Sequence, residues 1–201
     1  MVKYLLSVVL HFASGAVARE VSWLPCRRAF GSLAVAVATA TLLITLGIHI
    51  NLSASAPRGL YRAVVGTPLR GMWVAACVSP DAAVVGLARG YVRPGPCPGG
   101  AEPILKPVVA VSGDVVDLSP HGVVVNGISL PESGTASVDS SARPLTHATW
   151  GQHVVADDQL WLMSTRVPNS WDSRYLGPFS RSQVRAIARP VWTIESPGRQ
   201  L

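Results

Sequence analysis

Hydrophobic residues form one long uncharged run near the N-terminus and many short runs after it. Residues 30–50 contain no Asp, Glu, Lys or Arg over 21 positions. As a helix with a rise of about 1.5 Å per residue, this run would measure roughly 31 Å, close to the hydrocarbon thickness of a bilayer. We expect a single transmembrane helix over residues 30–50. A buried core helix is the alternative, although such a helix would rarely stay uncharged for so long.

Residues 1–29 form an N-terminal extension that we expect to be cytoplasmic or interfacial. Lys3 precedes an apolar stretch over residues 4–18 that ends in small residues, which resembles a secretory signal peptide with its cleavage site. A start codon placed too far upstream is a further alternative. Within 15 residues of the uncharged run, three arginines precede it and two follow it, a weak bias for an internal N-terminus: Arg19, Arg27, Arg28, then Arg58 and Arg62.

The remaining residues, 51–201, have the short alternating runs of a mainly β domain, with Gly, Pro, Asn and Asp between them. Residues 80–89 favour one short helix, because Ser79 can cap it, Pro80 suits its first position and Gly90 can end it. Residues 131–148 are rich in Ser, Thr and Pro and predict an exposed loop. The predicted strands cover residues 60–65, 72–78, 104–111, 115–118, 122–130, 159–164 and 184–194.

Composition and motifs argue against nucleic-acid binding and against a metal site. The net charge of +6 comes from scattered arginines, with no basic helix and no aromatic-interleaved stripe, so we expect no nucleic-acid partner. The chain has no Cys-x-x-Cys pair and no His-Glu-x-x-His, so we expect no metal site. Cys77 and Cys97 could close a disulfide in an oxidising compartment, or they could be two unrelated buried thiols.

A first candidate for chemistry follows the uncharged run directly. Ser53 and Ser55 lie two residues apart among small residues, before the turn signal Pro57-Arg58-Gly59. A nucleophile needs small neighbours and a rigid backbone, so that a substrate carbonyl can approach. A serine-rich linker is the plain alternative.

The second candidate is Lys106, one of only two lysines in the chain, the other being Lys3. It lies within the apolar run 104–111, where burial would lower its pKa and allow a neutral amine to take a proton from a serine hydroxyl. Alternatively, Lys106 lies on an edge strand with its amine in water, and the following Pro107 suits an edge or a bulge.

The third candidate is the segment 169–178, NSWDSRYLGP. Asp172 and Arg174 could form an internal ion pair that shapes a tight loop. Alternatively, Asp172 orients the site or tunes its charge.

Together these segments resemble the bacterial type I signal peptidase clan, and most closely its conjugative-transfer branch, the TraF-type peptidases. The resemblance covers roughly residues 30–193 and rests on Ser-x-Pro-x-Gly-Leu-Tyr, Arg-Gly-Tyr-Val with Cys-Pro-Gly-Gly, Leu-Lys before Val-x-Ala-Val-x-Gly-Asp, and Asp-Ser-Arg-Tyr-x-Gly-Pro. Two departures stand out. Ser55-Ala56-Pro57 is one residue shorter than the general Ser-Met-x-Pro pattern, and Pro107 replaces a more usual basic residue.

The resemblance implies a signal-peptidase-like antiparallel β-sheet domain on a single N-terminal transmembrane helix. It implies Ser55 as nucleophile, Lys106 as general base and Asp172 as a third functional carboxylate, with Arg174 as structural support. By the same resemblance, the Ser53 hydroxyl and the Ser55 amide form the oxyanion hole.

The expected function is a serine endopeptidase anchored in the inner membrane, with its catalytic domain on the periplasmic side and no cofactor. Its partners would be a precursor protein, such as a pilin that it cleaves or cyclises, and inner-membrane lipid. Two alternatives stay open: a general type I signal peptidase, and a non-catalytic assembly protein of a conjugation or secretion apparatus.

Overall fold

The computed structural model describes residues 24–195, so most of the predicted extension 1–29 lies outside the described residues. Helix α1 spans Leu24–Thr45 and strand β1 spans Ile48–Asn51. The prediction of one helix over residues 30–50 was therefore wrong at its end. Gly47 turns the chain at a φ of +67°, and residues 48–51 then pair with β2, which satisfies their backbone groups in a sheet.

Among the described helices, none combines the length and the apolar character needed to cross a membrane. The chain separates into two compact units, one ending at Leu42 and the other beginning at Leu43. All the β-structure and every candidate catalytic residue belong to the second unit.

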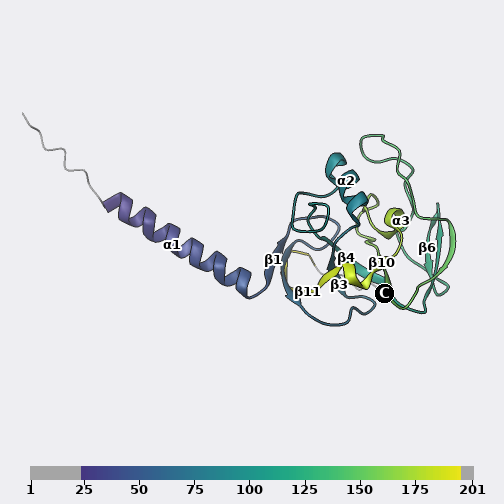
Figure 1. Cartoon of the computed structure of the whole chain (residues 1–201), viewed down its shortest axis with the longest axis horizontal. Coiled ribbons are helices and arrows are strands. Elements are labelled where there is room, and N and C mark those ends of the chain that lie inside the picture. Colours follow the sequence, from purple (N-terminus) through teal and green to yellow (C-terminus); the bar gives the residue numbers. More distant parts are fainter. Residues whose placement is uncertain (1–23, 196–201) are drawn as a thin grey trace, which may run out of the picture. The chain divides into compact units, whose positions relative to one another are not determined.

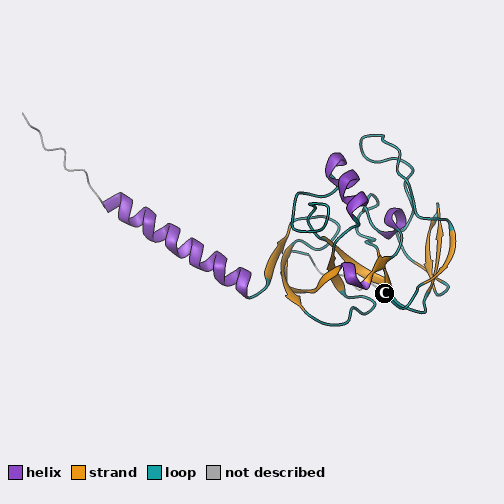
Figure 2. Ribbon diagram, viewed as in Figure 1, coloured by secondary structure: helices purple, strands orange, loops and turns teal. Residues whose placement is uncertain are grey.

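Two antiparallel sheets form the second unit, which confirms the predicted mainly β, antiparallel class (Figures 1 and 2). The larger sheet has the order β1-β2-β11-β3-β4-β9-β10 and the smaller has the order β7-β6-β5-β8. Strands of the larger sheet after β1 are β2 Gly59–Val64, β3 Trp73–Ala76, β4 Ile104–Ala110, β9 Gln159–Leu162, β10 Phe179–Ser180 and β11 Val184–Thr193. Those of the smaller sheet are β5 Val115–Ser119, β6 Gly122–Val125, β7 Ile128–Ser129 and β8 Gly151–Val154.

Helix α2, Pro80–Arg89, confirms the predicted helix and its ends. The Ser79 hydroxyl accepts a hydrogen bond from the Ala82 amide, and Gly90 ends the helix in the left-handed conformation. The strand predicted over residues 122–130 is instead the two strands β6 and β7, because Asn126 and Gly127 turn the chain with positive φ values of 50° and 80°.

Several short elements were not predicted. They are β8, β10, the four-residue helix α3 Ser173–Leu176 and the 3₁₀ turn Arg181–Gln183. The segment 131–148, predicted as an exposed loop, is partly docked on the domain. The Asp139 carboxylate accepts hydrogen bonds from the Tyr91 hydroxyl at 2.5 Å and from the Arg143 guanidinium at 2.7 Å.

Strand β4 connects two hydrophobic clusters. Val108 packs with the cluster that includes α2 and the adjoining strands, while Val109 and Ala110 pack with Trp161 and the smaller sheet. The predicted disulfide is present between Cys77, just after β3, and Cys97. A bridge that closes a loop of this length contributes about 3 kcal/mol in the chain-entropy description, and it holds the loop 90–102 against β3.

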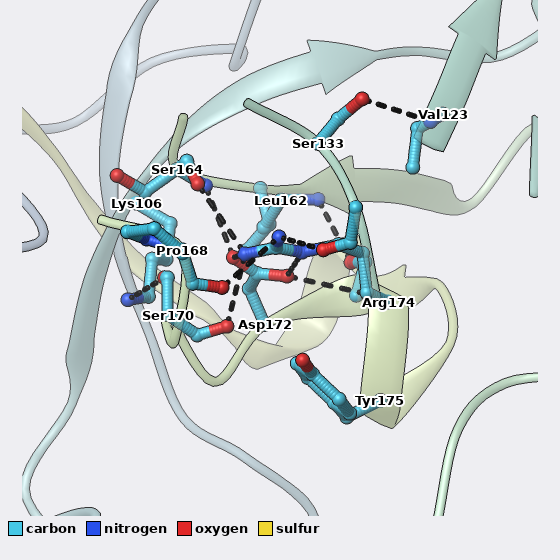
Figure 3. Close-up of polar contacts among 12 residues, drawn as sticks. Lys106, Val123, Ser133, Leu162, Ser164, Pro168, Ser170, Asp172, Arg174 and Tyr175 are labelled. Carbon is cyan, nitrogen blue, oxygen red and sulfur yellow. Dashed lines mark hydrogen bonds and ion pairs between the residues drawn. The ribbon is translucent and has the colours of Figure 1, made fainter. Parts of the chain in front are cut away.

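A buried arginine organises the loops that follow β9 (Figure 3). Arg174 and Asp172 are both fully buried, and Arg174 binds the carboxylate through two nitrogens, each at 3.0 Å. The same guanidinium donates to backbone carbonyl groups of four other residues: Gly134, Ser164, Pro168 and Ser170. One side chain thereby fixes the two ends of the segment 164–170 relative to α3.

We predict that Asp172→Ala lowers the free energy of unfolding by about 3–5 kcal/mol, because it leaves the Arg174 charge buried without its partner. Urea unfolding of the purified protein measures this change. Glu102→Ala is the matched control, since it removes the carboxylate of the exposed Arg93–Glu102 pair and should cost about 1 kcal/mol or less. Equal losses in the two variants would contradict the structural importance assigned to the buried pair.

Candidate active site

The loop between β1 and β2 holds both candidate serines. Asn51 fixes this loop from its N-terminal end: its side-chain amide donates to the carbonyl groups of Ser53, Ala56 and Pro57 at 3.0–3.2 Å. Its side-chain oxygen accepts from the Ser53 amide at 3.1 Å. The predicted rigid turn is therefore built by one asparagine that binds across it.

The Ser55 backbone is fixed from two further directions. Ala56 is buried against Tyr61, Trp73 and Ala188, and the Tyr61 hydroxyl donates to the Pro57 carbonyl at 2.7 Å. The Ser164 hydroxyl donates to the Ser55 carbonyl at 2.6 Å. The loop is thus part of the packed domain, which excludes the alternative of a solvated serine-rich linker.

The two serine side chains touch each other. Their hydroxyl oxygens lie 2.9 Å apart, and the Ser55 amide points to the Ser53 oxygen at a longer 3.4 Å. Ser55 is only 8% exposed, whereas Ser53 is exposed to solvent. The Ser53 hydroxyl and the Ser55 amide therefore lie side by side, and a hydroxyl and an amide are donor types that can stabilise an oxyanion.

Lys106 occupies β4 with its side chain 5% exposed, so it is not an edge lysine with its amine in water. The strand pairs with β3 along residues 104–107, where Lys106 lies opposite Val74. The ladder with β9 begins at Val108. Pro107 lies opposite Trp73 in the first ladder, and its carbonyl accepts a hydrogen bond from the Met163 amide at 3.1 Å on the side of β9.

The Lys106 amine donates a hydrogen bond to the Ser170 hydroxyl at 2.7 Å (Figure 3). Burial is the main cause that lowers the pKa of Lys106 from 10.5 to about 8, with Arg174 adding to the decrease and Asp172 opposing it. A pKa of about 8 leaves roughly a tenth of the amine neutral at pH 7. An ordinary lysine with a pKa of 10.5 has a neutral fraction at pH 7 that is smaller by more than about a hundredfold.

A single cavity brings the candidates together. It has a volume of about 740 Å³, and its lining includes Ser53, Ser55, Lys106 and Ser170. Within residues 24–195, the Lys106 amine forms its hydrogen bond with the Ser170 hydroxyl, and the Ser55 hydroxyl forms its hydrogen bond with the Ser53 hydroxyl. Catalytic hydrogen bonds often tighten only once substrate is bound, so a shared cavity is the relevant geometry here.

Asp172 lies behind this cavity and does not line it. Its carboxylate binds Arg174 and accepts from the Ser164 amide at 3.1 Å. Of the two alternatives for Asp172, the ion pair is present, and its negative charge also acts on Lys106 through space. A direct role for Asp172 in the reaction stays a prediction.

Two serines of the site were not predicted. Ser170 lay inside the quoted segment 169–178, and only its distance in sequence from Lys106 hid the contact. Ser164 gave no signal in the sequence, because its contact with the Ser55 carbonyl joins residues 109 positions apart. Within the described part of the chain, there is no group of three or more His, Cys, Asp or Glu side chains placed to hold a metal ion.

Comparisons with known proteins identify the family. The family model described as "Signal peptidase, peptidase S26" matches residues 1–193. A plasmid transfer protein TraF of Escherichia coli is 36% identical over 149 residues, which are 73% of this chain and 83% of the relative. A conjugal transfer protein TraF of Agrobacterium tumefaciens (strain 15955) is 38% identical over 151 residues, 73% of this chain and 83% of that protein.

Among solved structures, a signal peptidase I from Enterococcus faecalis V583 covers 62% of this chain and 98% of its own length, with a TM-score of 0.36 and 17% identity. The family match extends over nearly the whole chain, and the TraF relatives align along about three-quarters of it. The chain therefore belongs to the peptidase S26 family of signal peptidases.

Proposed function

We propose that the protein is a membrane-associated serine endopeptidase with a Ser55–Lys106 dyad, which cleaves a precursor protein in conjugative transfer. One observation supports this proposal most strongly: Lys106 is buried, and it lines the same cavity as Ser55. Burial of an ammonium group costs free energy. An apolar residue at position 106 would build the same strand without that cost, so the buried lysine points to a function.

The proposed reaction begins with the neutral Lys106 amine. It removes the Ser55 hydroxyl proton as the serine oxygen attacks the scissile carbonyl carbon. The Ser170 hydroxyl holds the amine in place throughout. The Lys106 ammonium then gives its proton to the leaving amine, and an acyl-enzyme remains.

Two donors would stabilise the tetrahedral oxyanion: the Ser55 amide and the Ser53 hydroxyl. The amide's existing bond to Ser53 is long at 3.4 Å, so it can be exchanged for one to substrate. Water, activated by Lys106, would release the acyl-enzyme as a linear product. A terminal amine attacking in place of water would give a cyclic product.

The substrate class and location come from the relatives and the disulfide. Because the relatives are named plasmid or conjugal transfer proteins, we assign the substrate to exported precursors of that process, such as a pilin. The Cys77–Cys97 bridge supports an oxidising compartment, hence the periplasmic side of the inner membrane. The uncharged run 30–50 would associate the enzyme with membrane lipid.

We predict that the purified protein converts a pilin precursor and that Ser55→Ala and Lys106→Met each reduce the rate at least about a thousandfold, because they remove the nucleophile and its base. Product formation is followed by mass spectrometry, which also separates linear from cyclic product. Ser182→Ala, an exposed serine outside the cavity, is the matched control and should keep the full rate.

Full activity in Ser55→Ala would contradict the dyad. Absence of conversion by the unaltered protein, with normal pilus assembly in cells carrying Ser55→Ala, would favour a non-catalytic assembly protein. Cleavage of many unrelated exported precursors, with rescue of cells that lack their general enzyme, would favour a general signal peptidase.

We also predict that kcat/KM rises about tenfold per pH unit below pH 8 and levels off above it. The base must be neutral to accept a proton, and the Lys106 pKa is lowered to about 8, so the active fraction grows with pH until that value is passed. Initial rates between pH 5.5 and 10 with one peptide substrate give the profile. A flat profile over this range would exclude Lys106 as the base.

A further inference from the structure

Ser164 connects the buried ion pair to the backbone of the candidate nucleophile. It lies two residues past the end of β9 and is fully buried. Its amide donates to the Asp172 carboxylate at 3.1 Å, and its carbonyl accepts from the Arg174 guanidinium at 3.4 Å (Figure 3). Its hydroxyl donates to the Ser55 carbonyl at 2.6 Å, across 109 positions of the sequence. One residue therefore joins the ion pair to the loop that carries Ser55.

The Ser55 carbonyl depends on this contact. Within residues 24–195, its hydrogen bond comes from the Ser164 hydroxyl, whereas Asn51 and Tyr61 hold neighbouring carbonyl groups of the loop. A hydroxyl group in a fully buried position costs free energy unless it is hydrogen-bonded, and an alanine would fill nearly the same space. Packing alone therefore does not call for a serine at position 164.

Fixing the Ser55 carbonyl also fixes the direction of the Ser55 side chain. The carbonyl belongs to the planar peptide group between Ser55 and Ala56. Since Ala56 on the far side of that plane is packed in the core, a rotation of the plane displaces the Ser55 Cα atom and its hydroxyl. A displacement of about 1 Å at a reacting group reduces a rate by about a hundredfold.

Asp172 lies outside the cavity that contains the reacting groups. Its carboxylate is fully buried and binds Arg174 and the Ser164 amide. A group that moves a proton in the reaction needs to be within hydrogen-bond reach of that proton. An effect of Asp172 on the nucleophile would therefore pass through another residue, and Ser164 contacts both Asp172 and Ser55.

We propose that Ser164 is a positioning residue, which couples the buried carboxylate of Asp172 to the placement of the Ser55 hydroxyl. This inference rests on the proposed peptidase function and adds a residue to it. In this role, Asp172 places the nucleophile through Ser164 without touching the reacting atoms. Asp172 also acts on Lys106 by its charge, whereas loss of the neutral Ser164 hydroxyl changes only the placement of Ser55.

The first test measures kcat and KM of the full-length protein with a peptide that it cleaves. Ser164→Ala should lower kcat about 10- to 100-fold and leave KM within about twofold, because the buried hydroxyl places the nucleophile and does not bind the peptide. Ser133→Ala is the matched control, since the Ser133 hydroxyl is also buried and donates to the Leu130 carbonyl at the same 2.6 Å, outside the cavity lining. This control should keep kcat. Equal values of kcat in the two variants would overturn the proposal.

The pH profile separates placement from charge. Ser164→Ala removes no charge, so the rise of kcat/KM should keep its midpoint near pH 8, the pKa of Lys106. Asp172→Asn removes a negative charge that raises the pKa of Lys106, so its midpoint should lie at lower pH. A midpoint that moves in Ser164→Ala would place the effect on Lys106 rather than on Ser55, and would overturn the assignment.

A double-substitution cycle tests the coupling itself. Asp172→Asn removes the charge of the side chain and keeps its size. In the variant that carries both Asp172→Asn and Ser164→Ala, the loss of kcat should be at least about threefold smaller than the product of the two single losses, because residues of one hydrogen-bond network are not independent. Losses that multiply would show that the two residues act separately, and would overturn the coupling.

A measurement without catalysis keeps this inference separate from the proposed function. Ser-Ala pairs occur at positions 53–54, 55–56 and 141–142, so protein labelled with ¹³C at the serine carbonyl and ¹⁵N at alanine gives one correlation for each pair. Ser55→Ala identifies the correlation that reports on the Ser55 carbonyl. This signal should move in Ser164→Ala and in Asp172→Asn, and it should stay in place in Ser133→Ala.

The two readouts together distinguish failure of the function from failure of the coupling. Absence of cleavage by the unaltered protein, with these movements of the Ser55 signal, would overturn the peptidase function and support the link from Asp172 to Ser55. A Ser55 signal that stays in place in Asp172→Asn would overturn the coupling even where cleavage is normal.

Discussion

The burial of the Lys106 amine is the constraint on which the proposed chemistry of this protein depends. An ammonium group within β4 is costly, and the structure offsets part of that cost with one hydrogen bond to Ser170 and the nearby charge of Asp172. The remaining penalty lowers the pKa of Lys106 to about 8. In the proposed function, that penalty is what converts an ordinary lysine into a base that works near neutral pH.

The rest of the site keeps the Lys106 amine buried and the Ser55 backbone in place. Arg174 binds Asp172 and the carbonyl groups of Ser164 and Ser170, so a single guanidinium positions these two serines. Ser164 then holds the Ser55 carbonyl, while Ser170 holds the Lys106 amine. Asp172 therefore helps to organise these loops from a buried position outside the cavity lining, and its charge also opposes the decrease in the pKa of Lys106.

Sequence patterns predicted those helices and strands whose formation depends on residues close together in the chain. The apolar run of β4 and the caps of α2 depend on neighbouring residues, and both elements were predicted correctly. The end of α1 was wrong because pairing of residues 48–51 with β2 overrides an apolar run that would also suit a helix. The contacts of Ser164 and Ser170 could not be predicted, since each is made with a residue distant in sequence that the fold brings beside it.

Direct titration of Lys106 tests the central claim most closely. The chain contains two lysines, so protein labelled with ¹³C at lysine Cε gives two side-chain signals, and Lys106→Met identifies the one from the site. The buried amine should titrate with a midpoint near pH 8 in the intact protein. A midpoint near the ordinary value of 10.5 would mean that the amine is solvated and charged at neutral pH, and would contradict its role as a base.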